Sequence, residues 1–205
     1  MPTPISHIVL TEKIYEKHFG QKNRKEFYIG TCFPDIRRNA GIKRSKVHFK
    51  NLKLEDIKKE DSFNAGFKIH SLIDEMSKEY FRKEEIYEIC PEGRYRIHSL
   101  KAVQDRLCYD EIGYWDEFIN YLDDILDVQL QFGIDRGVIE DWHVTLQQYF
   151  SKKPDEFSVG RLFHRVCYSK EDCDEINRLV KEIEKDKKLL SIINSFNLNF
   201  EDLLT

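Results

Sequence analysis

The stretch from Phe63 to Met76 constrains the fold of this chain more than any other. Asp61 and Ser62 offer helix-capping oxygens before it, and the apolar residues that follow recur every three or four positions. The two adjacent apolar stripes of this helix consist of Phe63 and Phe67, and of Gly66, Ile69, Ile73 and Met76. A helix that is apolar over so wide an arc is expected at the centre of a helical protein.

The same helix carries an imidazole and a carboxylate on its first apolar stripe. His70 follows Phe67 by three residues and Asp74 follows His70 by four, so both polar side chains are expected to face the interior. A buried carboxylate is costly unless it is paired or bound to a metal ion. Two interpretations of the helix remain open: His70 and Asp74 hydrogen-bond each other or lie at the surface, or they belong to a metal site.

Composition favours a single, all-α domain spanning residues 1–205, since a chain of this length with only 9 Gly and 5 Pro suits a multi-helix bundle. The net charge of −4 offers no electrostatic basis for binding nucleic acid. No apolar run is long enough for a transmembrane segment. The five cysteines lack metal-ribbon or redox spacing and are interpreted as free thiols. Because no signal-peptide pattern is seen either, we expect a cytoplasmic protein.

Three further residues of the N-terminal third offer nitrogen or carboxylate ligands. His7 lies on the inward side of a helix that begins after Thr3 with Pro4 at its first position. Asp35 follows a proline and opens a polar loop, and His48 closes that loop between two apolar residues. Each alone has an ordinary structural explanation, such as a buried histidine bonded to a carbonyl or an aspartate that caps a turn.

Taken together, these side chains predict a metal site. Its ligands would be His7, Asp35, His48, His70 and Asp74. Nitrogen and carboxylate ligands in this mixture suit zinc, and also manganese or iron. Two ions would be natural because a carboxylate such as Asp74 can bridge them, and ions about 3.5–4 Å apart can activate water and hold a phosphate oxygen.

Cationic side chains near these ligands are candidates for binding the phosphate of a substrate. Arg37 and Arg44 lie in the loop between Asp35 and His48, and Arg96 lies near the start of a later helix. The planar guanidinium fork of arginine matches the geometry of a phosphate group. The alternative for each is an arginine that is simply exposed to water.

A helix that starts near Tyr95 supplies one more candidate metal ligand, His98. A short connection to the central helix predicts that the two pack side by side. His98, with Asp105 two turns later, would then face the metal site. Alternatively, His98 packs under Tyr109 and has a structural role only.

Four short motifs within residues 3–74 resemble, in their order, the zinc-dependent phospholipase C family in its broad bacterial sense. They read Pro-x-x-x-His up to His7, Gly-x-x-x-Pro-Asp-Ile around Asp35, His-Phe at His48, and Gly-x-x-x-His-x-x-x-Asp up to Asp74. The resemblance implies an all-α fold of the phospholipase C and P1 nuclease type, in which the five side chains bind metal. It also implies that Asp74 bridges two ions, that Asp35 is a ligand and a base, and that metal-activated water attacks a phosphodiester.

Two features depart from the secreted members of that family. Those proteins bind one ion through an N-terminal tryptophan amine, whereas residue 1 here is methionine. They also use a His-x-x-x-Glu pair, whereas His98 is followed four positions later by Ala102. We therefore expect one or two zinc ions rather than three.

The resulting prediction is a zinc-dependent phosphoric ester hydrolase, a phosphodiesterase or phosphoesterase resembling phospholipase C. Asp35 and Asp74 would be its catalytic residues, and a small phosphate ester or a lipid headgroup its substrate. Two alternatives remain. One is a non-catalytic helical protein that retains a structural metal site. The other is an HD-type nucleotide phosphohydrolase, although that class uses adjacent His and Asp, a dipeptide that this chain lacks.

Overall fold

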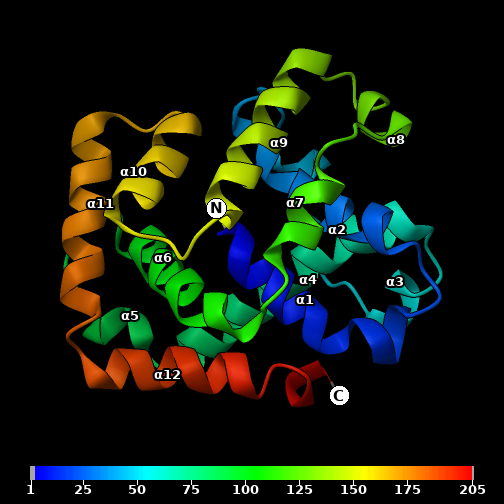
Figure 1. Cartoon of the computed structure of the whole chain (residues 1–205). Helices are drawn as coiled ribbons and strands as arrows, with labels where there is room; N and C mark the ends of the chain where they lie inside the picture. The colour runs from blue at the N-terminus through cyan, green and yellow to red at the C-terminus, as the bar shows by residue number, and fades with distance from the viewer. Residues whose placement is uncertain (1–2, 205) are drawn as a thin grey trace.

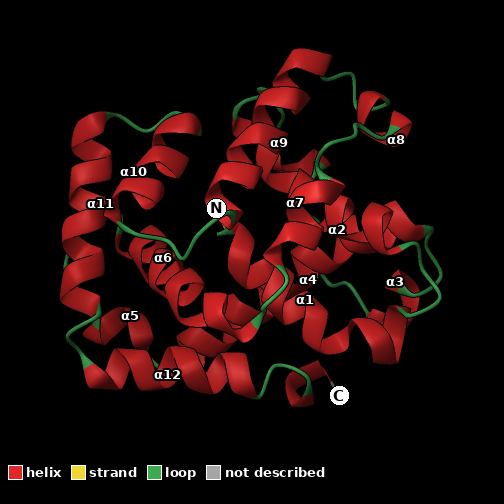
Figure 2. Ribbon diagram, viewed as in Figure 1, coloured by secondary structure: helices red, strands yellow, loops and turns green. Residues whose placement is uncertain are grey.

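The computed structural model describes residues 3–204, and every regular element within that range is a helix, which confirms the all-α prediction (Figures 1 and 2). The α-helices are α1 (Pro4–Phe19), α2 (Arg24–Cys32), α3 (Leu54–Ile57), α4 (Ser62–Lys83), α5 (Ile86–Ile89), α6 (Arg96–Cys108), α7 (Trp115–Tyr121), α8 (Asp127–Leu130), α9 (Arg136–Phe150), α10 (Glu156–Arg165), α11 (Lys170–Ile183) and α12 (Lys187–Leu198). The 3-10 helices are η1 (Phe33–Arg38), η2 (Arg44–Lys46), η3 (Tyr109–Glu111) and η4 (Asp202–Leu204).

The central helix α4 begins where its capping residue predicts. The Asp61 side chain accepts a hydrogen bond from the backbone N–H of Asn64 at 2.9 Å, which satisfies one of the free donors at the helix start. The helix then continues for 22 residues and buries Phe63, Phe67, Ile69 and His70 among others. The wide apolar arc is therefore covered by neighbouring helices, as expected for a central helix.

Glycine allows α2 and α4 to pack with their backbones in contact. A Cβ atom at Gly66 of α4 would overlap the carbonyl oxygen of Phe27 in α2. A Cβ atom at Gly30 of α2 would likewise overlap the carbonyl oxygen of Phe63. Only residues without side chains permit so close an approach, and this crossing sets the position of α4 relative to the segment that follows α2.

The start of α1 is bound to α6 rather than capped by its own residues. The Thr3 side chain makes no capping bond to the helix. Instead, the Asp105 carboxylate accepts from the backbone N–H of Ser6 at 2.7 Å. The Thr3 hydroxyl donates to the Lys101 carbonyl at 2.9 Å. These bonds fix the first turn of α1 against α6.

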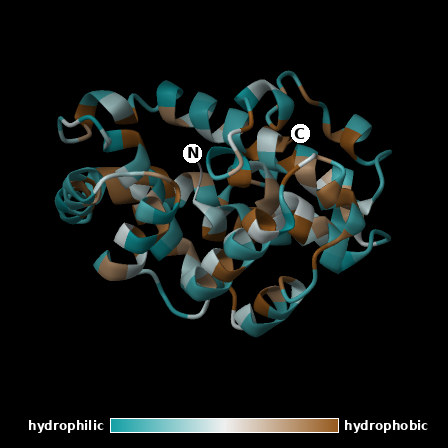
Figure 3. Ribbon diagram, turned by 90° about the horizontal axis from the view of Figure 1, so that it is seen from above, coloured by the Kyte–Doolittle hydropathy of each residue, from teal (hydrophilic) through white to brown (hydrophobic). Residues whose placement is uncertain are grey.

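The C-terminal helices form an outer layer beside this arrangement. In Figure 1, α11 and α12 lie along two edges of the molecule, where α11 packs on α6 and α10 and α12 packs on α4, α5 and α6. The buried apolar side chains join into one cluster that reaches from Ile5 to Phe200. Figure 3 shows the outer turns of the helices to be largely hydrophilic.

Two further predictions concern the cysteines and membrane spans. All five cysteines lie in the described part of the chain and are free thiols. Among residues 3–204, none of the helices combines the length and apolarity that crossing a lipid bilayer requires.

Candidate metal centre

The structure brings together the five side chains that the sequence motifs single out. His7 comes from α1, Asp35 from η1, and His48 from the segment after η2. His70 and Asp74 come from successive turns of α4. The α2–α4 crossing holds η1 beside α4, because η1 directly follows α2.

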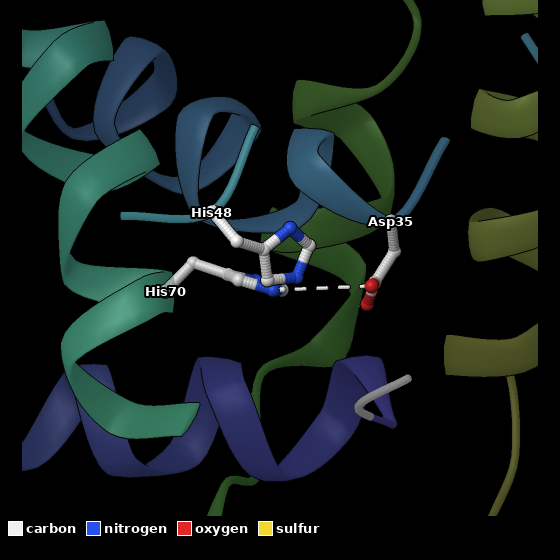
Figure 4. Close-up of side chains that lie close together, drawn as sticks. All are labelled: Asp35, His48 and His70. Carbon is white, nitrogen blue, oxygen red and sulfur yellow. Dashed lines mark ion pairs between the residues drawn. The ribbon is translucent and has the colours of Figure 1, made fainter. Parts of the chain in front are cut away.

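Asp35, His48 and His70 form the tightest part of this group (Figure 4). Each offers one ligand atom, and these atoms all lie within 4.8 Å of one another. His70 Nε2 lies 3.8 Å from Asp35 Oδ1, and the His48 ring stands nearly perpendicular to that of His70, at 84°. The three side chains are at most 5% exposed, so little of their surface reaches bulk water.

Backbone carbonyls orient two of the imidazoles. His70 Nδ1 lies 2.9 Å from the Thr31 carbonyl oxygen, and His7 Nδ1 lies 3.2 Å from that of Thr3. Because a carbonyl only accepts, each Nδ1 carries the proton and each Nε2 keeps a lone pair for another partner. The two rings stack at a centroid distance of 4.1 Å, so His7 lies beside the group, with its Nε2 3.8 Å from Asp74 Oδ1.

Several of these ligand atoms are buried without any hydrogen bond. They are His7 Nε2, Asp35 Oδ1, both ring nitrogens of His48, and His70 Nε2. Buried polar atoms normally have partners, so a convergent set without them requires an explanation. A divalent cation such as zinc could bind Asp35 Oδ1, His70 Nε2 and one ring nitrogen of His48, since imidazole nitrogens and a carboxylate oxygen suit its preference for nitrogen and oxygen ligands. The residues present therefore fit a metal ion.

Burial keeps the three imidazoles in the protonation state that a metal site requires. It lowers the pKa of His7 to about 4 and that of His48 to about 3, and it holds the pKa of His70 well below its usual value. All three imidazoles are thus neutral at pH 7, the form that binds metal. Burial raises the pKa of Asp35 to about 8 and outweighs the opposing effect of Lys101 and Arg37, so Asp35 would release a proton on binding a metal ion.

Asp74 adjoins this group but already has cationic partners. Its Oδ1 accepts from Lys101 Nζ at 3.0 Å, and its Oδ2 accepts from Arg44 Nη2 at 3.0 Å. The Asp74 oxygens also lie 3.8 Å from His7 Nε2 and 3.6 Å from His48 Nε2. Burial disfavours the charged form of Asp74, yet the surrounding positive groups, Lys101 foremost, hold its pKa well below the usual value.

A cleft of about 720 Å³ opens beside His48 and Asp74. Its lining residues are Arg44, Ser45, His48, Phe49, Lys50, Ser71, Asp74, Glu75 and Lys78. The sequence interpretation missed Lys50, Ser71 and Lys78. Ser71 stands three residues before Asp74, and Lys78 stands four residues after it. Helical spacing, which puts such residues on one face, was the only sequence signal that could have identified them.

The three arginines predicted to bind phosphate differ in their surroundings. Arg44 lines the cleft and bonds to Asp74. Arg37 lies in η1, close to Asp35, and is half-buried. Arg96 instead donates to the Tyr87 carbonyl at 3.2 Å and is not among the residues that line the cleft, so its predicted role needs correction. The connection between α5 and α6 is short, which lets Arg96 bind the preceding helix.

His98 also needs correction as a metal ligand. Its Nε2 lies 2.9 Å from the Tyr168 hydroxyl, and its ring packs against Tyr95, Phe163 and Tyr168. Asp105, its proposed companion, binds the backbone of α1 instead. The face of α6 that carries His98 therefore meets aromatic side chains, while Lys101 of the same helix reaches Asp74. No local pattern pairs Lys101 with Asp74, so the sequence interpretation missed it.

Three comparisons with known proteins give no match: no family model matches the chain, and neither a curated protein nor a solved structure matches it significantly.

Proposed function

We propose that this protein binds a divalent metal ion, zinc foremost, and hydrolyses a phosphate ester in the adjoining cleft. The observation that carries the proposal is the convergence of buried, unpartnered ligand atoms next to a cationic cleft. Structural zinc sites are closed, whereas catalytic ones keep a position open to substrate. Because the cleft reaches His48 and Asp74, the arrangement favours a catalytic ion over a structural one.

Asp35, His48 and His70 would hold the ion, with His7 Nε2 beside them. When bound, a divalent ion supplies Lewis acidity, which makes a water molecule more acidic and neutralises charge on a phosphoryl oxygen. The Thr3 and Thr31 carbonyls keep the His7 and His70 rings in the required orientation.

The two aspartates have different roles in this proposal. Both oxygens of Asp74 already accept from cations, so Asp74 is suited to orienting Lys101 and Arg44 rather than to accepting a proton. Asp35 Oδ1 has no partner in the protein. We therefore assign Asp35 the role of ligand and base, and Asp74 that of an orienting carboxylate.

The cleft supports a small phosphate ester or a headgroup as substrate. Its volume of about 720 Å³ is in the range of small-molecule sites, and Arg44, Lys50 and Lys78 supply positive charge along it. Arginine offers a phosphate two parallel hydrogen bonds, and lysine adds a point charge. The resemblance to the zinc-dependent phospholipase C family points to the same chemistry. The proposal also includes a fold of the phospholipase C and P1 nuclease type. It further includes a cytoplasmic location.

The test is metal analysis combined with a substrate screen. Protein purified without metal-affinity resin is analysed by inductively coupled plasma mass spectrometry and assayed with bis(p-nitrophenyl) phosphate, p-nitrophenyl phosphate and p-nitrophenylphosphorylcholine. Zinc at a fixed stoichiometry and turnover of at least one ester are expected. Asp35→Asn should weaken metal binding by about 10–100-fold or more and should abolish turnover.

Asp105→Asn is the matched control, because Asp105 is equally buried but binds the backbone of α1. It should retain both metal and turnover. Protein that binds no metal, or an Asp35→Asn variant that retains it, would contradict the proposed site. Metal without hydrolysis of any ester would support the non-catalytic alternative.

A further inference from the structure

The two aspartates of the candidate metal centre differ in what already surrounds them. Asp35 Oδ1 is buried and has no hydrogen-bond partner. Asp74 has a cation on each oxygen, Lys101 Nζ on Oδ1 and Arg44 Nη2 on Oδ2, both at 3.0 Å. One carboxylate is therefore open to a metal ion, whereas the other is already paired with two positive charges.

Lys101 is more firmly placed than Arg44. The Lys101 side chain is 16% exposed and that of Arg44 is 50% exposed. The Lys101 carbonyl accepts from the Thr3 hydroxyl at 2.9 Å, and the Thr3 carbonyl in turn accepts from His7 Nδ1. The Lys101 backbone thus belongs to the framework that orients His7, which fixes the point from which its ammonium reaches Asp74, whereas the Arg44 side chain is half exposed to the cleft.

A fixed ammonium at Asp74 limits how many metal ions the five side chains can hold. An ion bound to Asp74 would lie within a few ångströms of Lys101 Nζ, because that nitrogen is 3.0 Å from the ligand oxygen. Positive charges so close together repel strongly in a buried site, where little water screens them. A second ion would therefore have to displace a lysine that is already in place.

We propose that the protein holds one metal ion per chain, at Asp35, His48 and His70, and that the Lys101 ammonium occupies the position beside Asp74 that a second ion would need. This inference rests on the proposed metal-dependent function. Lys101 is then a positioning residue: it fixes Asp74 and supplies a constant positive charge at the edge of the centre.

The test is metal stoichiometry. Metal-free protein is dialysed against excess zinc, and the ions per chain are counted by mass spectrometry. Wild-type protein should bind one ion. Lys101→Met removes the charge but keeps most of the side chain's length, and it should bind two, because His7 Nε2 and Asp74 Oδ1 then face each other across 3.8 Å.

Lys78→Met is the matched control. Lys78 is an exposed lysine of the same cleft, so its replacement should leave the count at one ion. Electron paramagnetic resonance of the manganese-loaded proteins gives a second readout, since an isolated Mn²⁺ ion and a spin-coupled pair have different spectra. Wild-type protein should show the isolated ion, and Lys101→Met the coupled pair.

The outcomes separate this inference from the function on which it rests. Two ions in the wild-type protein would overturn the inference and leave the metal-dependent function intact. One ion in both wild type and Lys101→Met would overturn the role of Lys101. No ion in any of the proteins would overturn the metal site itself. If Lys101→Met does not fold, the manganese spectrum of the wild-type protein still distinguishes one ion from two.

Discussion

At the scale of single residues, the hydrogen bonds of each buried histidine indicate its role. His143 is satisfied on both sides, since Nδ1 bonds to the Leu122 carbonyl at 2.9 Å and Nε2 to the Gln129 amide at 3.0 Å. His7 and His70 are satisfied only at Nδ1. A histidine with both nitrogens bonded has a structural role, whereas one with an open nitrogen that meets other open ligand atoms can bind a metal.

His98 is expected to behave as a structural residue. His98→Ala removes the bond to the Tyr168 hydroxyl and the ring contacts around it, so it should lower the free energy of unfolding by about 1–3 kcal/mol. Metal content should remain that of the wild type. Urea unfolding and mass spectrometry measure the two quantities. Tyr168→Phe, which removes only the hydroxyl, should cost less, and a loss of metal in His98→Ala would contradict this assignment.

Asp105 should make stability depend on pH. Burial raises its pKa from 3.8 to about 7, despite the N–H that Ser6 donates to it. Between those pH values the folded protein keeps a proton that the unfolded chain has lost, so stability should fall as pH rises from about 4 to about 7. In Asp105→Asn the amide oxygen can still accept from Ser6, but the ionisation is gone.

Urea unfolding of both proteins at several pH values, with a chelator present, measures this effect. The other titrating groups are common to both proteins, so the difference between the two curves isolates Asp105. Relative to the variant, the wild type should lose on the order of 2–4 kcal/mol across this range. Parallel curves would show that Asp105 does not titrate there.

At the scale of elements, the α2–α4 crossing positions the candidate metal centre. The crossing places His70 of α4 against the Thr31 carbonyl at the end of α2, and η1 with Asp35 follows directly. The chain can pack this closely only because Gly30 and Gly66 lack side chains. A small displacement of α4 would therefore change stability and site geometry together.

Gly66→Ala tests that coupling. The added methyl group would overlap the Phe27 carbonyl oxygen, which is backbone and cannot turn aside. The variant should lose about 3 kcal/mol or more of stability and bind metal more weakly. Gly160→Ala is the control, since its Cβ would lie 3.4 Å from Asn177 Nδ2 in a helix interior. That change should be neutral or stabilise by up to about 1 kcal/mol. Equal stability of both variants would contradict the close crossing.

At the scale of the whole molecule, a metal ion would connect elements that the chain otherwise joins through loops. Asp35, His48 and His70 belong to η1, the segment after η2, and α4, and His7 adds α1. An ion bound only by the folded protein stabilises it in proportion to the logarithm of ligand concentration over Kd.

Removal of the metal should therefore lower thermal stability. At a free zinc concentration 100- to 1,000-fold above Kd, bound zinc should raise the free energy of unfolding by about 3–4 kcal/mol. For a chain of this size, that corresponds to a rise in Tm of roughly 5–15 °C. Differential scanning calorimetry with zinc and with chelator measures the shift. Asp35→Asn should show little dependence on zinc, and a wild-type Tm that zinc leaves unchanged would count against the site.

Much of the helical framework follows from contiguous residues. The Asp61 cap and the spacing of Phe63, Phe67 and His70 predict both the start of α4 and its buried face. The start of α1 follows from proline at its first helical position, although Asp105 of α6, and not Thr3, binds that turn. These features depend on helical periodicity and capping, which act over a few residues and can be seen in the sequence.

The tertiary structure alone decided which partner each polar atom has. Lys101 meets Asp74 across 27 residues, His98 meets Tyr168 across 70, and Asp105 meets Ser6 across 99. Spacing within α6 predicts which of its residues share a face, but not which neighbour each face meets. That choice depends on how the packed helices are placed against one another, so the partners of Asp74 and His98 became known only with the fold.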